Sequence, residues 1–81
     1  MSKKRSKSPA RSDQKLTQEI QDALKLDNSV PEERIAVEVS DGSVTLSGNV
    51  NGLFQKEAAE YDTKRIRGVR AVTNLINVSA R

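Results

Sequence analysis

The 81-residue chain contains no cysteine, no histidine and no tryptophan. Without cysteine it cannot form disulfide bonds or thiolate metal sites, and without histidine it lacks imidazole bases and histidine-ligated zinc. One phenylalanine and one tyrosine are present, so a core has to be built from valine, leucine, isoleucine and alanine. No apolar run approaches the ~20 residues that a membrane-spanning helix needs. The length allows one small domain.

The remaining side chains offer little for catalysis. Serines have no histidine partner, and the four glycines do not form a phosphate-binding loop followed by a lysine. We therefore expect a protein that is not an enzyme, with no catalytic residues, no metal site and no cofactor.

Charge is distributed unevenly along the chain. The net charge is +3, from 14 basic and 11 acidic residues. Up to residue 15 there are six basic residues and one acidic residue, a charge of +5, and the remaining eight basic and ten acidic residues give −2. Residues 1–11 have almost no apolar side chains, so burial cannot offset the entropy of ordering them. We expect a disordered basic tail over residues 1–11 and a folded domain over residues 12–81.

Two roles stay open for this tail. It is either a polybasic arm for anionic lipid or nucleic acid, or a solubilising leader. Its basic start is not followed by the apolar segment of a secretory signal peptide. As the chain stands this predicts a cytoplasmic protein, and a periplasmic one if the chain is a fragment of an exported protein.

Apolar residues recur at helical spacing after the tail. Leu16, Ile20, Ala23 and Leu24 follow the i, i+4, i+7, i+8 pattern of an amphipathic helix. We expect this helix to begin with Ser12 as its N-cap and to end near Leu26, before a run of turn-forming residues.

The segment VEVSDGSVTLSGNV, residues 37–50, has the period of two that is typical of paired strands. Asp41-Gly42 at its centre is the preferred chemistry for a two-residue hairpin turn, in which both residues need positive φ. Gly48 occupies an inward-facing position, which predicts a bulge or a helix packed closely against the strand.

A second helix is expected over residues 52–67, with Gly68 as its left-handed C-cap, and a last strand over residues 70–78 interrupted by Asn74. The element order is αββαβ. We predict an α+β fold in which a three-stranded sheet has both helices packed on one face, with the strand order left open.

The hairpin pattern V.V.DG.VTLSG.V, a helix containing KEAAE and the segment RGVRAVTNLINV resemble the BON domain, named for bacterial osmotic-stress and nodulation proteins. The resemblance covers residues 12–79. The matching motif residues are turn and core positions that imply architecture, and none of them is implied to contact a ligand: Asp41, Gly42, Leu46, Gly48, Gly68, Val69 and Asn74.

The resemblance implies an αββαβ fold without catalytic activity. It also implies, for a family often found in periplasmic, outer-membrane or pore-associated proteins, association with phospholipid membranes or other cell-envelope components. The partner expected here is accordingly an anionic phospholipid surface or an envelope protein.

Four cations near the end of the second helix are the predicted anion-binding or lipid-binding residues: Lys64, Arg65, Arg67 and Arg70. Clustered positive charge favours phosphate or anionic head groups, and the tail would add to the same field. The alternative is that these cations only stabilise a helix C-terminus.

Asp62 is atypical because it falls in the middle of the apolar arc of a helical wheel, which consists of Phe54, Ala58, Ala59, Tyr61 and Ile66. One interpretation is a partly buried carboxylate with a raised pKa that binds a cation or a partner's amine. The interpretation we favour is that Asp62 lies at the edge of the packed region, where it reaches water or pairs with Arg34 or a lysine, because burying an unpaired charge is costly.

Two other function classes stay open. A nucleic-acid-binding module rests on the basic tail, but the folded part is net acidic and nearly free of aromatic residues, which argues against it. A purely protein-binding module would add a strand to an exposed sheet edge.

Overall fold

The structure is a computed structural model that describes residues 11–79; the predicted disordered tail lies almost entirely outside these residues. The elements in chain order are α1 (Arg11–Leu26), the short 3-10 helix η2 (Glu32–Arg34), β1 (Ile35–Ser40), β2 (Ser43–Val50), α2 (Leu53–Lys64), β3 (Ala71–Asn74) and β4 (Asn77–Val78). The predicted α+β class and the order of helices and strands are confirmed.

The predicted hairpin is present with its expected turn. β1 and β2 pair antiparallel with Ser40 opposite Ser43. The two turn residues have positive φ, 53° at Asp41 and 82° at Gly42, which is the backbone of a type I′ turn. The side chains of β1 alternate between half-buried and exposed positions as the period of two predicts.

β2 is the central strand. β3 and β4 both pair with it in parallel, on the side away from β1. The expectation of one last strand is therefore corrected to two short strands. The break follows from Asn74, whose side-chain oxygen accepts a hydrogen bond from the Ile76 amide at 3.1 Å. The Leu75 amide still donates to the carbonyl of Leu46 at 2.8 Å, so the segment stays attached to β2 through the break.

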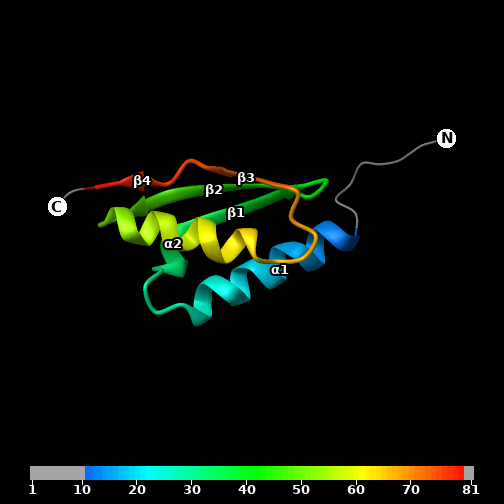
Figure 1. The fold of residues 1–81 in the computed structure, drawn as a ribbon, viewed down its shortest axis with the longest axis horizontal. Coiled ribbons are helices and arrows are strands. Elements are labelled where there is room, and N and C mark those ends of the chain that lie inside the picture. Colours follow the sequence, from blue (N-terminus) through cyan, green and yellow to red (C-terminus); the bar gives the residue numbers. More distant parts are fainter. Residues whose placement is uncertain (1–10, 80–81) are drawn as a thin grey trace.

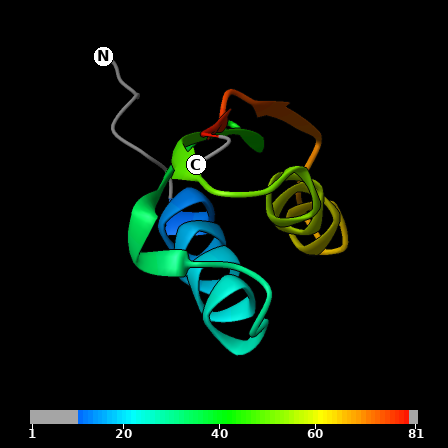
Figure 2. The same cartoon turned by 90° about the vertical axis from the view of Figure 1, so that its left-hand side faces the viewer.

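Both helices lie side by side on one face of the sheet, as predicted (Figures 1 and 2). The core between the layers is aliphatic: Leu16, Ile20, Leu24, Val30, Val44, Leu46, Val50, Ala59 and Ile76. The inward positions of α1 and β2 in this list are those that the sequence pattern selects. Within residues 11–79, neither helix combines the length and apolar character that crossing a bilayer requires.

Both predicted helix boundaries need correction. α1 already includes Arg11, so Ser12 is not its N-cap. α2 ends at Lys64 rather than at residue 67. Residues 65–68 form a turn, and Gly68, with φ of 102°, lies in this turn instead of directly capping the helix.

The buried face of α2 agrees only in part with the apolar arc of the helical wheel. Ala59, Asp62 and Thr63 are buried, whereas Phe54 and Tyr61 are 63% and 65% exposed. At the start of the helix, the Gln55 side-chain oxygen accepts hydrogen bonds from the amides of Asn51 and Gly52. The two aromatic side chains lie on the outer surface.

Gly48 is explained by a close backbone approach. Its φ is 133°, and a Cβ atom there would lie 2.1 Å from the carbonyl oxygen of Arg34. The near neighbour is the last residue of η2, not a packed α-helix. Only glycine fits this position without moving the backbone.

Candidate functional site

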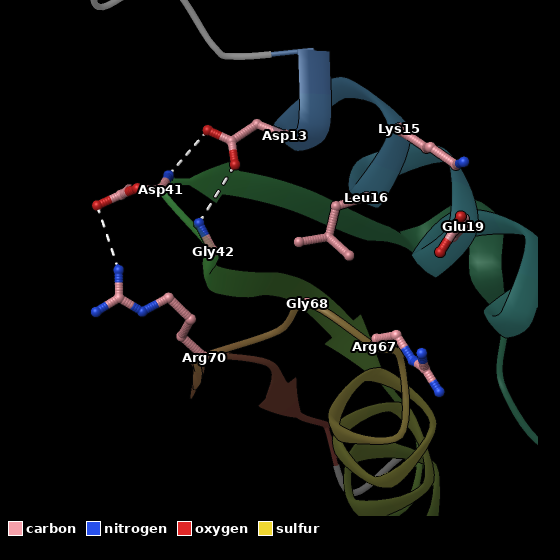
Figure 3. A pocket seen from close by; sticks show the side chains of 9 residues that line it. All are labelled: Asp13, Lys15, Leu16, Glu19, Asp41, Gly42, Arg67, Gly68 and Arg70. Carbon is pink, nitrogen blue, oxygen red and sulfur yellow. Dashed lines mark hydrogen bonds and ion pairs between the residues drawn. The ribbon is translucent and has the colours of Figure 1, made fainter.

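An open pocket of about 410 Å³ lies at the end of the molecule where the hairpin turn meets the helices. Figure 3 shows that its wall comes from three segments: the first turns of α1, the β1–β2 turn and the loop after α2. The cations around it are Lys15, Arg67 and Arg70, which we call the cationic end.

Asp13 holds the hairpin turn against α1. Its side chain is 7% exposed. The carboxylate accepts hydrogen bonds from the amide of Asp41 at 2.9 Å and from the amide of Gly42 at 3.3 Å (Figure 3). The type I′ backbone of the turn leaves these two N–H groups without partners in the strand ladder, so a buried carboxylate can satisfy both. Asp13 is therefore a structural anchor, and its charge is already engaged.

Arg70 is placed at the pocket rim by its backbone. Its amide donates to the carbonyl of Gly42 at 2.8 Å, and a Cβ atom on Gly42 would lie 2.7 Å from the Arg70 side chain. The guanidinium lies 3.5 Å from the Asp41 carboxylate, with both side chains largely exposed. A surface ion pair of this kind contributes little free energy, so it leaves the arginine available to another anion.

Lys15 and Arg67 complete the cationic end. Both are exposed. Within the described part of the chain, neither has a carboxylate within the 4.0 Å of an ion pair. Because α1 starts here, the basic residues 3–7 are joined covalently to the same end of the molecule.

The four cations predicted from the sequence are divided between two places. Arg67 and Arg70 lie at the cationic end. Lys64 pairs with Glu60 at 2.9 Å, which helps to hold the pKa of Glu60 below its ordinary value, together with a hydrogen bond from Asn74. The guanidinium of Arg65 lies 5.5 Å from the centre of the Tyr61 ring, within the range of a cation–π contact.

Asp62 is buried, which corrects the expectation that it reaches water or pairs with Arg34 or a lysine. Its side chain is 8% exposed, and its Oδ2 atom has no hydrogen-bond partner among the described residues. Burial raises the pKa of Asp62 to about 7, helped by a hydrogen bond with Asp27 and by the negative charge of Asp27, whereas Arg65 acts in the opposite direction.

Asp27 is the partner that sequence reasoning missed. Its carboxyl group lies beside that of Asp62, and the Ser29 amide donates to it at 2.9 Å. These hydrogen bonds, first that with Asp62, lower the pKa of Asp27. The opposite shifts make Asp62 the acid of the pair that keeps its proton to higher pH and Asp27 the acid that ionises first. The 35-residue separation gives no sequence signal for this pair.

The motif residues of the family resemblance occupy turn and core positions. Leu46 is fully buried, Val69 packs against the core, and a Cβ atom on Gly68 would lie 3.6 Å from Leu16. Asn74 joins α2 to the sheet through hydrogen bonds to the Lys56 carbonyl at 3.0 Å and to the Glu60 carboxylate at 3.1 Å.

Within residues 11–79, no group of three or more acidic side chains is arranged to hold a metal ion. The charged features of the described residues are cations at one end and an acid pair, Asp27 and Asp62, elsewhere on the helical layer.

Comparisons with known proteins agree with this architecture. The chain matches the BON domain family over residues 12–80. It is 41% identical to osmotically-inducible protein Y of Escherichia coli (strain K12) over 58 residues, which are 72% of this chain and 29% of that protein. The fold is similar to the C-terminal domain of CdsD, the structural protein of the type III secretion system of Chlamydia trachomatis. That similarity has a TM-score of 0.69 at 17% identity and covers 83% of this chain and 33% of the other. The chain belongs to the BON domain family.

Proposed function

We propose that this protein is a non-enzymatic binding module that associates with an anionic phospholipid surface of the bacterial cell envelope. The observation that carries the proposal is the convergence of Lys15, Arg67 and Arg70 on one pocket at the end where residues 1–10 join the domain. The names of the relatives support the setting, because one is osmotically inducible and the other is structural in a secretion system. We infer a role in the envelope under osmotic stress.

Two cations at the cationic end have no ion pair of their own. Three acids line the same pocket, Asp13, Glu19 and Asp41. Asp13 is engaged by two backbone amides and Asp41 faces Arg70, so Lys15 and Arg67 are the cations that an outside anion can pair with directly. Each lysine or arginine near an anionic membrane contributes about 1 kcal/mol of attraction. The four basic residues of segment 3–7 add to that attraction because they are attached to this end.

A second candidate is docking to an envelope protein. It is favoured by large apolar side chains on the outer surface: Leu53, Phe54, Tyr61 and Leu75, each more than half exposed. Aromatic side chains beside cations are enriched in protein interfaces. β1 is also an edge strand that another chain can extend.

Co-sedimentation with vesicles tests the lipid proposal. Binding to phosphatidylglycerol vesicles should exceed binding to phosphatidylcholine vesicles and should weaken as salt is raised from 50 mM to 500 mM, because counterions screen the attraction. Equal binding to neutral and anionic vesicles would reject it. Stronger binding to duplex DNA that vanishes when residues 1–10 are removed would favour a nucleic-acid module instead.

A further inference from the structure

A second open groove lies between the end of α1 and the last turns of α2, with a volume of about 670 Å³. We call it the acidic groove. Its walls include the two carboxyl groups of Asp27 and Asp62, the apolar side chains of Leu26 and Ile66, and Arg65 at one side. Leu26 is 84% exposed, so an apolar surface is left open beside two acids.

The unsatisfied atom in this groove is Oδ2 of Asp62. It is buried without a hydrogen-bond partner among the described residues, although the side chain lines an open groove. A buried polar atom without a partner destabilises the folded state, and more so when it is charged. A ligand that donates hydrogen bonds to this atom would recover that free energy on binding, which gives the groove a specific affinity for donors.

Arg65 does not satisfy Asp62 from within the chain. Its guanidinium lies over the Tyr61 ring at 5.5 Å, and it forms no ion pair with Asp62 within 4.0 Å. Lys64, the next nearest cation in sequence, pairs with Glu60 instead. Neither of these two cations forms an ion pair with Asp62, so the groove can still accept a cation from a partner.

We propose that the acidic groove binds the guanidinium group of an arginine side chain from a partner protein. A guanidinium presents five N–H donors in a planar fork, so one group can donate to Asp27 and to Oδ2 of Asp62 at once. Its methylene stem would lie against Leu26 and Ile66, as long cationic side chains do on apolar surfaces. A divalent metal ion is a poorer match, because two carboxylates supply too few of the six or more oxygen ligands that calcium takes.

Binding of arginine is coupled to a proton. The charged groups that face Asp62 are Asp27 at the end of α1 and Arg65 on the turn after α2. Arginine needs Asp62 ionised, so docking displaces the proton of Asp62, and affinity must rise with pH through the pKa of about 7. Between pH 6 and pH 8 the ionised fraction rises roughly tenfold, and the association constant should rise by a similar factor.

The test is an NMR titration of the full chain with N-acetyl-arginine amide, following the side-chain carboxyl carbons of Asp27 and Asp62. We expect both signals to move together at pH 8 and to move far less at pH 6. The matched neutral probe is N-acetyl-citrulline amide, which keeps the shape of the side chain without its charge and should not bind. N-acetyl-lysine amide should bind more weakly than arginine, because an ammonium cannot match the fork.

Three variants locate the binding. Asp62→Asn and Asp27→Asn should each weaken arginine binding at least fivefold, whereas Asp22→Asn, which changes an exposed acid of α1, should leave it unchanged. Asp62→Asn should leave vesicle binding intact, which separates this groove from the cationic end. Unmoved carboxyl signals, equal binding of citrulline or lysine, tighter binding of calcium chloride alone, or full affinity in Asp62→Asn would each overturn the proposal.

Discussion

The carboxylate of Asp13 accepts a hydrogen bond from the backbone amide of Asp41 at 2.9 Å, across 28 positions of sequence. This contact joins the start of α1 to the β1–β2 turn and closes one side of the pocket at the cationic end (Figure 3). Because Asp41 also faces Arg70, one turn residue connects the first helix to the segment before β3. The position of the cations thus depends on the hairpin turn.

Replacing Asp13 tests this anchor. Asp13→Ala removes the acceptor of two backbone N–H groups, one of them buried, and should lower the free energy of unfolding by about 2 kcal/mol. The measurement is urea denaturation followed by circular dichroism. Asp22→Ala is the control, because Asp22 is an exposed acid of the same helix. A loss below about 0.5 kcal/mol, the usual range for a surface substitution, would show that the anchor is not important for stability.

Gly48→Ala tests the close approach of β2 to η2. The new Cβ would collide with the backbone carbonyl of Arg34 at a residue with φ of 133°, so we expect a loss of about 2–3 kcal/mol. Gly52→Ala is the matched control. Its φ is extended, and a Cβ there meets the mobile ring of Phe54. Equal losses in the two variants in thermal unfolding would contradict this explanation.

Asn74→Ala should detach the end of β3 from α2. The side chain donates to Lys56 and Glu60 and accepts from the Ile76 amide, so its loss leaves polar groups unsatisfied and should cost about 2 kcal/mol. Hydrogen exchange should show faster exchange of the Ile76 amide in this variant. The exposed hydrogen-bond pair Asn77 and Asn49 provides the control, since Asn77→Ala should change stability little. Unchanged exchange at Ile76 would be the contrary result.

Stability should fall as pH rises through the range in which Asp62 ionises. The pKa of Asp62 is about 7 when folded and 3.8 ordinarily, so between these values the folded state binds more protons than the unfolded state. The free energy of unfolding then decreases with rising pH. One pKa unit corresponds to about 1.4 kcal/mol, and we expect a loss of about 2 kcal/mol between pH 5 and pH 8.

Asp62→Asn isolates this effect. Its amide mimics the protonated acid and can donate to Asp27, so the loss between pH 5 and pH 8 should disappear. The lowered pKa of Asp27 has the opposite sign and acts in a lower window, because its contribution is lost as pH falls below the ordinary value of 3.8. Urea denaturation at several pH values measures both. A wild-type profile parallel to that of the variant would contradict the raised pKa of Asp62.

Local patterns predicted the elements, whereas the contacts that define the sites are long-range. The period of two and Asp41-Gly42 were enough for the hairpin because a type I′ turn depends on its own two residues. The core stripe of α1 followed from helical spacing alone. The strand order could not be predicted, because the sequence of β2 does not indicate that this strand is paired on both edges.

The helical wheel was right only in part for α2. It placed Phe54 and Tyr61 inward together with Ala59, whereas Ala59 and Asp62 face the core and the two aromatic side chains are exposed. The Asn74 side chain connects this helix to the sheet by donating hydrogen bonds to the Lys56 carbonyl and the Glu60 carboxylate. Asp62 was singled out by its position in the apolar arc, but its partner Asp27 was not. Pairs between distant segments appear only when the fold is known.

Replacing pairs of cations by neutral glutamine tests which cations matter for membrane binding. Arg67→Gln with Arg70→Gln should weaken binding to phosphatidylglycerol vesicles roughly thirtyfold, at about 1 kcal/mol for each cation. Lys25→Gln with Arg34→Gln removes the same charge from exposed positions away from the pocket and should have a much smaller effect. Equal losses in the two double variants would mean that net charge alone governs binding.

The most direct test of the cationic end is an NMR map of backbone amides on addition of phosphatidylglycerol nanodiscs. Our account predicts that the signals of residues 13–19, 41–42 and 67–70 broaden or shift first, because these segments surround the pocket. Perturbation confined to the outer face of α2 around Phe54 and Tyr61, or no perturbation at all, would contradict it.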